Sequence, residues 1–154
     1  MERPALQSVK LTGAWKLVSC EARSSKGEVT HLYGKDPVGM LMYDSRGNMS
    51  VLLMRRDRPN FTSGDLLKGT PEEIKAAFEG SLAYCGTYEV NEEKKTVTHH
   101  VEGSTFPNWV GTDLVRFLEY SGDQLLLNTP SIPAGDEHWT VHLIWKRASK
   151  MKQA

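Results

Sequence analysis

The chain has 154 residues, and its 19 Lys and Arg are balanced by 19 Asp and Glu, so its formal net charge at pH 7 is zero. A chain of this length forms one domain that buries roughly 70% of its unfolded surface, so it needs no disulfide or metal to be stable. The balanced charge excludes nucleic acid as an expected partner, because nucleic-acid binding needs a concentrated basic face. We predict a single domain over residues 1–154, with its core over about 11–147 and frayed ends.

The N-terminus and the cysteines favour a soluble, cytoplasmic protein. The first residues lack the apolar run of roughly 7–15 residues that a secretory signal requires. No later segment approaches the ~18 apolar residues of a membrane span. Cys20 and Cys85 lie far apart in strand-like segments, and reduced thiols are typical of cytosolic proteins. We expect no membrane partner, and a monomer or a homodimer.

Short segments of alternating hydrophobicity, separated by turn residues, fill most of the chain. Such spacing is typical of a sandwich or a barrel, and the tight turns suit sequential hairpins. The predicted fold class is all-β, a closed antiparallel up-and-down barrel. The predicted strands are Ala14–Ala22, Val29–Tyr33, Gly39–Tyr43, Met49–Met54, Ala83–Val90, Thr96–Glu102, Asp113–Tyr120, Gln124–Asn128 and His138–Lys146.

One segment between the strands carries helix signals and follows a basic run. Arg55-Arg56-Asp57-Arg58 is interpreted as a solvated loop rather than an anion site. Thr70 suits an N-cap and Glu73 stands three residues later, which predicts a short helix at about 71–80 near a barrel end. With the polar loop before it, this helix would form a lid or pack on the outer wall. Its apolar residues are Ile74, Ala77 and Phe78.

The predicted strand Thr96–Glu102 contains adjacent histidines, whose side chains must point to opposite faces. Val97 and Val101 share a face with His99, so we expect His99 to line a cavity and His100 to face solvent. A buried, neutral imidazole both donates and accepts protons near neutral pH, which suits acid–base catalysis. The alternative is a histidine hydrogen-bonded into the core.

Two neighbouring strands supply the other candidate catalytic residues. Pairing of Ala83–Val90 with the histidine strand brings Tyr84 or Tyr88 beside His99, either for proton transfer or to hold a polar ligand group. In the strand Asp113–Tyr120, the alternation leaves open whether Arg116 or Glu119 faces inward. An interior Arg116 would need a carboxylate partner or an anionic ligand.

Several segments resemble one family. Gly13-Ala14-Trp15 and Trp145-Lys146-Arg147 resemble the lipocalin pattern, in which an early Trp is covered by a late Arg at the closed end of the barrel. Four longer segments resemble the small bacterial and fungal lipocalin-like domain proteins: Tyr33–Gly39, Gly86–Val90, Thr98–Ser104 and Phe106–Thr112. The resemblance implies a barrel of about eight to ten strands around an apolar cavity. Some such barrels are cofactor-free cyclases, isomerases or dehydratases.

We therefore expect the barrel to bind a hydrophobic, aromatic small molecule. The leading hypothesis is cofactor-independent cyclisation, isomerisation or elimination, with His99, Tyr88, Tyr84 and Arg116 as catalytic candidates. The alternatives are a carrier of a metabolite and a haem-binding barrel with His99 as ligand. No metal-ligand spacing or phosphate-binding loop is present in the sequence, so we expect no cofactor. The predicted ligand-binding residues are Leu41, Tyr43, Met49, Val51, Phe78, Val97, Val101, Trp109 and Phe117.

Overall fold

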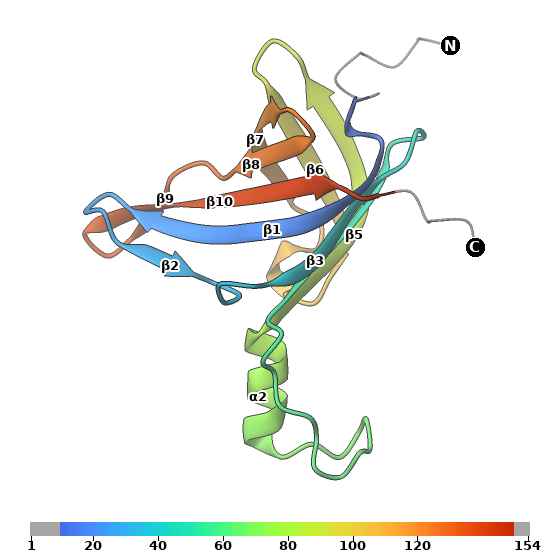
Figure 1. The fold of residues 1–154 in the computed structure, drawn as a ribbon, viewed down its shortest axis with the longest axis vertical. Coiled ribbons are helices and arrows are strands. Elements are labelled where there is room, and N and C mark those ends of the chain that lie inside the picture. Colours follow the sequence, from blue (N-terminus) through green and yellow to red (C-terminus); the bar gives the residue numbers. More distant parts are fainter. Residues whose placement is uncertain (1–9, 150–154) are drawn as a thin grey trace.

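The computed structural model describes residues 10–149, in which eight antiparallel strands close into a barrel (Figure 1). The strands pair in chain order, and the pairing of the first with the last closes the ring. This confirms the predicted all-β, up-and-down barrel. The eight strands are β1 (Gly13–Ser24), β3 (Val38–Tyr43), β4 (Asn48–Met54), β5 (Ser81–Asn91), β6 (Thr96–Ser104), β7 (Asp113–Ser121), β8 (Gln124–Asn128) and β10 (Glu137–Arg147).

Two short strands lie at the edge of the ring. β2 (Val29–His31) pairs with β1, and β9 (Ile132–Ala134) pairs with β10. The sequence predicts β2 but not β9, because three residues with a central proline show no alternation to interpret. The short 3-10 helix η1 (Pro107–Trp109) between β6 and β7 was likewise not predicted.

One end of the barrel is closed by a tryptophan and an arginine. The guanidinium of Arg147 lies 4.1 Å from the ring centre of Trp15, a contact that stabilises by roughly 0.5–2 kcal/mol. The indole nitrogen of Trp15 donates to the Leu11 carbonyl oxygen at 2.9 Å, and Arg147 Nη1 donates to the Thr12 carbonyl oxygen at 2.9 Å. The prediction of frayed ends falls on residues outside the described range, apart from Lys10, Ala148 and Ser149.

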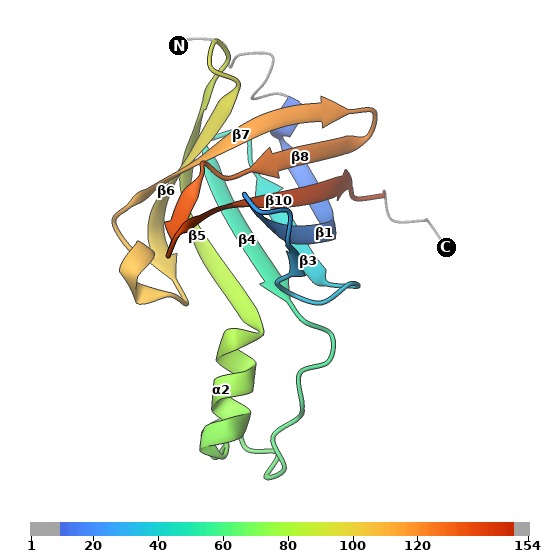
Figure 2. The ribbon, with the colours of Figure 1, turned by 90° about the vertical axis from the view of Figure 1, so that its left-hand side faces the viewer.

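Residues 55–80, which we call the arm, leave the barrel between β4 and β5 and end in the helix α2 (Pro71–Glu79). The helix begins as predicted, because Thr70 accepts from the Glu73 amide and the Glu73 side chain accepts from the Thr70 amide. Figures 1 and 2 show the arm projecting away from the barrel, and no residue of α2 is buried. The predicted lid is therefore wrong, and so is packing on the outer wall. Within residues 10–149, no helix combines the length and apolar character needed to cross a bilayer.

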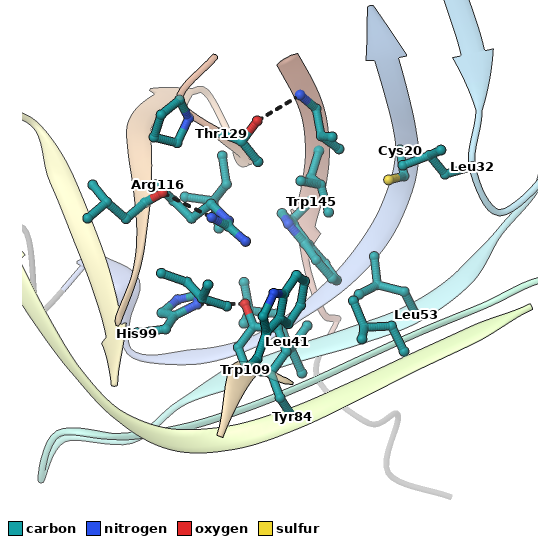
Figure 3. A pocket seen from close by; sticks show the side chains of 18 of the residues that line it. Cys20, Leu32, Leu41, Leu53, Tyr84, His99, Trp109, Arg116, Thr129 and Trp145 are labelled. Atoms are coloured by element: carbon teal, nitrogen blue, oxygen red, sulfur yellow. Dashed lines mark hydrogen bonds between the residues drawn. The ribbon is translucent and has the colours of Figure 1, made fainter. Parts of the chain in front are cut away.

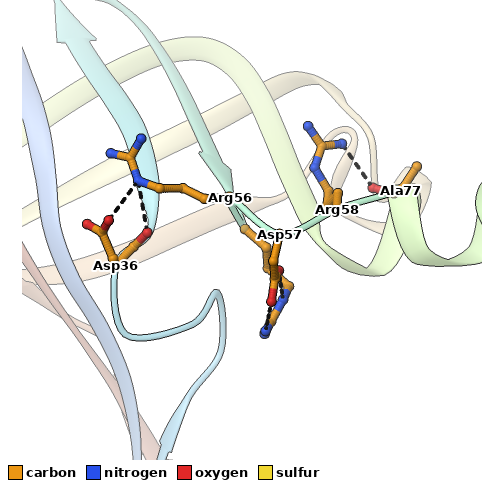
Figure 4. A network of polar contacts seen from close by, with 6 residues as sticks. Asp36, Arg56, Asp57, Arg58 and Ala77 are labelled. Carbon is orange, nitrogen blue, oxygen red and sulfur yellow. Dashed lines mark hydrogen bonds and ion pairs between the residues drawn. The ribbon is translucent and has the colours of Figure 1, made fainter. Parts of the chain in front are cut away.

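Arginines tie the root of the arm to its surroundings (Figure 4). Arg55 donates to both carboxylate oxygens of Asp57, at 2.8 and 2.9 Å. Arg56 Nε lies 3.0 Å from the carbonyl oxygen of Asp36 and 3.2 Å from its carboxylate. Arg58 donates to the Ala77 carbonyl oxygen at 3.5 Å. The basic run is thus a loop whose arginines hold the arm in place by internal contacts.

Candidate functional site

The barrel contains a partly open cavity of about 550 Å³, a volume typical of small-molecule sites. Most of the side chains around it are apolar or aromatic, and they come from strands on all sides of the ring (Figure 3). Trp109 of η1 reaches the cavity, and its ring meets Tyr84 edge-on with 5.7 Å between centroids. The apolar lining includes Leu41, Val51, Leu53, Leu127, Val141 and Leu143, and the polar lining includes Cys20, His99, Asp113, Arg116 and Thr129.

His99 lies on the inner face of β6 between two tyrosines, and the three side chains form a hydrogen-bonded row. The Tyr43 hydroxyl lies 2.6 Å from His99 Nε2, and the Tyr84 hydroxyl lies 2.8 Å from His99 Nδ1. His99 is 2% exposed. Burial, together with the nearby charge of Arg116, lowers the His99 pKa to about 3. His99 is therefore a neutral imidazole, and both of its ring nitrogens are occupied.

His100 lies on the outer face of the same strand, between two carboxylates. Its Nδ1 is 2.7 Å from Asp113 and its Nε2 is 3.3 Å from Glu89. The hydrogen bond to Asp113 is the main cause of a raised His100 pKa. The two histidines thus have opposite surroundings, as the alternation of a strand requires.

Arg116 faces the cavity from β7, whereas Glu119 is exposed. Arg116 Nη1 donates to the Val115 carbonyl oxygen at 3.0 Å. In the part of the chain that the structure describes, no carboxylate lies within ion-pair distance of this guanidinium. Burial raises the pKa of Tyr84, and the charge of Arg116 acts against that rise. The alternation could not predict which of Arg116 and Glu119 faces the cavity, because both sets of alternate residues on this strand contain large apolar side chains.

The structure separates the predicted site residues into two groups. Six of them line the cavity: Leu41, Val51, Tyr84, His99, Trp109 and Arg116. Seven do not. Val97, Val101 and Met49 are buried in the core beside it. Phe117 is 48% exposed on the outer face of β7, and Phe78 is 51% exposed on the arm. The remaining two are Tyr43 and Tyr88.

Neither tyrosine has the role that the sequence assigns to it. Tyr88 is paired directly across from His99 in the β5–β6 register, but its hydroxyl donates to the Asp44 carbonyl oxygen at 2.7 Å. Tyr43, predicted as a ligand-binding residue, instead holds the imidazole. Gly86 contributes to this arrangement, because a Cβ there would collide with the His100 carbonyl oxygen, and a bulge in the strand pairing lies beside it at Cys85 and Gly86. Tyr84, beyond the bulge, reaches His99 diagonally.

The thiol of Cys20 and the phenol of Tyr33, which also line the cavity, are neutral. Burial raises the pKa of the Cys20 thiol to about 12 and, as the main cause, that of Tyr33 to about 12. Cys20 therefore carries no thiolate to act as a nucleophile. A haem iron would have to displace a tyrosine to reach either nitrogen of His99, which disfavours the haem alternative.

The comparison with known families agrees with this barrel. The model of a family described as the lipocalin-like domain matches residues 12–148. The chain belongs to the lipocalin-like domain family. Among the curated proteins, this lipocalin-like chain is similar to the "4'-hydroxy-3'-methoxypropiophenone carrier protein ppsC" of Aspergillus oryzae. The two are 34% identical over an alignment of 111 positions, which covers 67% of this chain and 99% of the relative.

Sequence reasoning missed several residues that line the cavity of this lipocalin-like barrel. Trp145 is predicted only as part of the closing segment, yet its indole faces the cavity, and Cys20 and Tyr33 are absent from the predicted site. Alternation along β10 would have placed Trp145 inside. In β1 an irregularity in the pairing between Leu17 and Ser19 shifts the alternation, so the pattern that starts at Trp15 would have pointed Cys20 outward. Tyr33 follows β2 in an irregular segment, where no pattern predicts which way a side chain points.

Proposed function

We propose that this protein binds a largely hydrophobic, aromatic small molecule in the barrel cavity and carries it without changing it covalently. The observation that carries this proposal is that His99, the one histidine lining the cavity within residues 10–149, has Tyr43 on one ring nitrogen and Tyr84 on the other. A general base must reach the proton that it removes. His99 has no free nitrogen for a substrate, and its low pKa makes it a weak base.

The cavity itself suits such a ligand. Its lining offers aliphatic side chains for the body of the molecule and the aromatic rings of Tyr84, Trp109 and Trp145 for stacking. Its volume of about 550 Å³ is in the range of sites that hold one drug-sized molecule. The name of the fungal relative, a carrier of an aromatic ketone that also bears a hydroxyl group, supports a ligand of this class for the present chain.

A second candidate is the cofactor-independent cyclisation, isomerisation or elimination predicted from the sequence. One feature favours it: the row ends at Tyr84, a hydroxyl that lines the cavity close to the charge of Arg116. A proton could pass between a substrate and His99 through Tyr84. Under this hypothesis Tyr84 would be the group that touches the substrate, and His99 would act through it.

We also propose a cytoplasmic site of action for a monomer or a homodimer. Cys20, which is buried, and Cys85, which is exposed, are both free thiols, as is typical of a reducing compartment.

Filling the cavity tests the binding proposal. Leu53→Trp places an indole in the cavity, whereas Leu52→Trp on the same strand points outward from a residue that is 37% exposed. Titration with 4'-hydroxy-3'-methoxypropiophenone, followed by quenching of tryptophan fluorescence, should show saturable binding to the native protein and to Leu52→Trp. Leu53→Trp should bind at least about tenfold more weakly, a loss of ~1.4 kcal/mol. Equal binding by all three proteins would place the ligand outside the barrel.

A further inference from the structure

The upper part of the cavity presents hydrogen-bond donors that lack acceptors. Trp145 is 1% exposed, and its indole nitrogen has no hydrogen-bond partner in the described part of the chain. Arg116 enters the same space from β7, where its Nη1 donates to the Val115 carbonyl oxygen and its side chain is also hydrogen-bonded to Tyr84, so that some of its five N–H groups are left for a ligand. In Figure 3 the guanidinium and the indole point toward each other across the cavity. A buried donor without an acceptor costs roughly 1–3 kcal/mol, so this arrangement favours a ligand that supplies one.

The hydrogen-bonded row adds Tyr84 as a third donor. A neutral imidazole has one N–H and one bare nitrogen, so only one of the two tyrosines can donate to it. Tyr43 is buried and does not line the cavity, and its hydroxyl lies 2.6 Å from Nε2, so we assign the hydroxyl as the donor and Nε2 as the acceptor. Nδ1 then carries the hydrogen and donates to the Tyr84 oxygen. The hydroxyl hydrogen of Tyr84 is thereby released toward the cavity that Tyr84 lines.

The acceptors around the cavity are engaged elsewhere. The Thr129 hydroxyl accepts from the Val141 amide at 2.9 Å, and Asp113 is held by His100 on the outer side. Besides Arg116 and Asp113, the titratable groups around the cavity are Cys20, Tyr33, Tyr84 and His99, and burial keeps all four neutral. The half-buried guanidinium therefore faces an apolar space without a counterion, and a negatively charged ligand atom would supply one.

We propose that Arg116, Tyr84 and Trp145 form a receptor for a negatively charged oxygen on an aromatic ligand, so that the barrel binds phenols as phenolates. This rests on the proposed function, because the same cavity must hold the ligand. The oxygen accepts from the guanidinium, the hydroxyl and the indole N–H, while the ring of the ligand lies among the apolar side chains. Such charge-assisted hydrogen bonds are about twice as strong as neutral ones.

Two matched dyes test the proposal. 4-Nitrophenol shows by its absorption spectrum whether it is bound as phenol or phenolate, and 4-nitroanisole has nearly the same shape but cannot ionise. The protein should lower the apparent pKa of bound 4-nitrophenol by at least about one unit and bind the phenolate at least about tenfold more tightly than the ether. 4-Nitrobenzoate shows whether the negative oxygen can belong to a carboxylate as well as to a phenolate. If it binds as tightly as the phenolate of 4-nitrophenol, the receptor accepts carboxylates too. If it binds weakly, the receptor is specific for phenolates.

Variants identify the groups responsible. Arg116→Met should remove most of the preference for the phenolate and leave the affinity for 4-nitroanisole within about twofold of that of the native protein. Arg116→Lys should keep part of the preference for the phenolate. Tyr84→Phe and Trp145→Phe should each reduce the preference by a smaller factor. Lys146→Met is the matched control, because it removes a positive charge from the outside of β10. Circular dichroism and thermal melting confirm that each variant is folded.

The outcomes separate this proposal from the function on which it rests. If 4-nitrophenol binds as the neutral phenol with the affinity of 4-nitroanisole, and Arg116→Met changes neither, the receptor is disproved while binding in the barrel stands. If neither 4-nitrophenol nor 4-nitroanisole binds the folded protein, both proposals fail. An equal loss of phenolate preference in Lys146→Met would assign the effect to net charge and overturn the role of Arg116.

Discussion

His99 and His100 are neighbours on one strand, and the barrel gives them opposite environments. His99 is buried between two hydroxyls and has a pKa lowered to about 3, with burial as the main cause. His100 lies between Asp113 and Glu89 on the outer surface, and hydrogen bonding to Asp113 is the main cause of its raised pKa. The difference shows that an interior histidine need not be a base. In this barrel it positions a tyrosine at the cavity.

The two faces of β6 also differ in what their interactions contribute to stability. The inner contacts are buried, so a lost partner leaves a polar group without a hydrogen bond. The outer contacts are open to water, where ion pairs contribute about 0–1 kcal/mol. Mutations and pH should therefore affect the two histidines unequally.

The largest expected effect is on the pH dependence of the free energy of unfolding. Because the folded pKa of His99 is below the unfolded value of 6.5, the unfolded chain takes up the proton first. The contribution of His99 to the free energy of unfolding is complete above pH 6.5. It is lost as the pH falls toward 3, and the loss is on the order of 5 kcal/mol. Urea unfolding between pH 7 and pH 4 should show this slope, and His99→Phe should remove most of it.

His100 should act in the opposite direction and more weakly. Its raised pKa gives a contribution that is complete below pH 6.5 and is lost as the pH rises through the folded value. His100→Phe should therefore leave the acid slope intact. If His100→Phe removed the acid slope and His99→Phe did not, the assignment of the inner and outer roles would be reversed.

A smaller effect is expected on stability at pH 7. His99→Phe leaves the buried Tyr43 hydroxyl without an acceptor, so it should cost about 2–3 kcal/mol, measured by urea unfolding. His100→Phe should cost less than about 1 kcal/mol. Adding Tyr43→Phe to His99→Phe removes the unsatisfied hydroxyl, so the double variant should recover part of the loss. A double variant less stable than either single one would show that the row is not held together by this bond.

The alternation of β6 was enough to predict which histidine faces inward, and the Thr70 and Glu73 signals were enough to place the start of α2. The contact between Tyr43 and His99 could not be predicted, because β3 and β6 are separated by two strands in the sheet and the contact depends on the shape of the closed barrel. The direction in which the arm leaves the barrel could not be predicted from the sequence either. A capping box and apolar spacing predict a helix, but they do not predict what the helix packs against.

The fate of a bound ligand tests the central claim, that this barrel carries an aromatic molecule without changing it. An aromatic ketone with a phenolic hydroxyl would be incubated with the protein, measured by equilibrium dialysis and then recovered for liquid chromatography and mass spectrometry. We predict saturable binding of one molecule per chain and recovery of the unchanged compound after many hours. A product that forms in amounts exceeding the protein, and that disappears with Tyr84→Phe, would contradict it and make the barrel an enzyme.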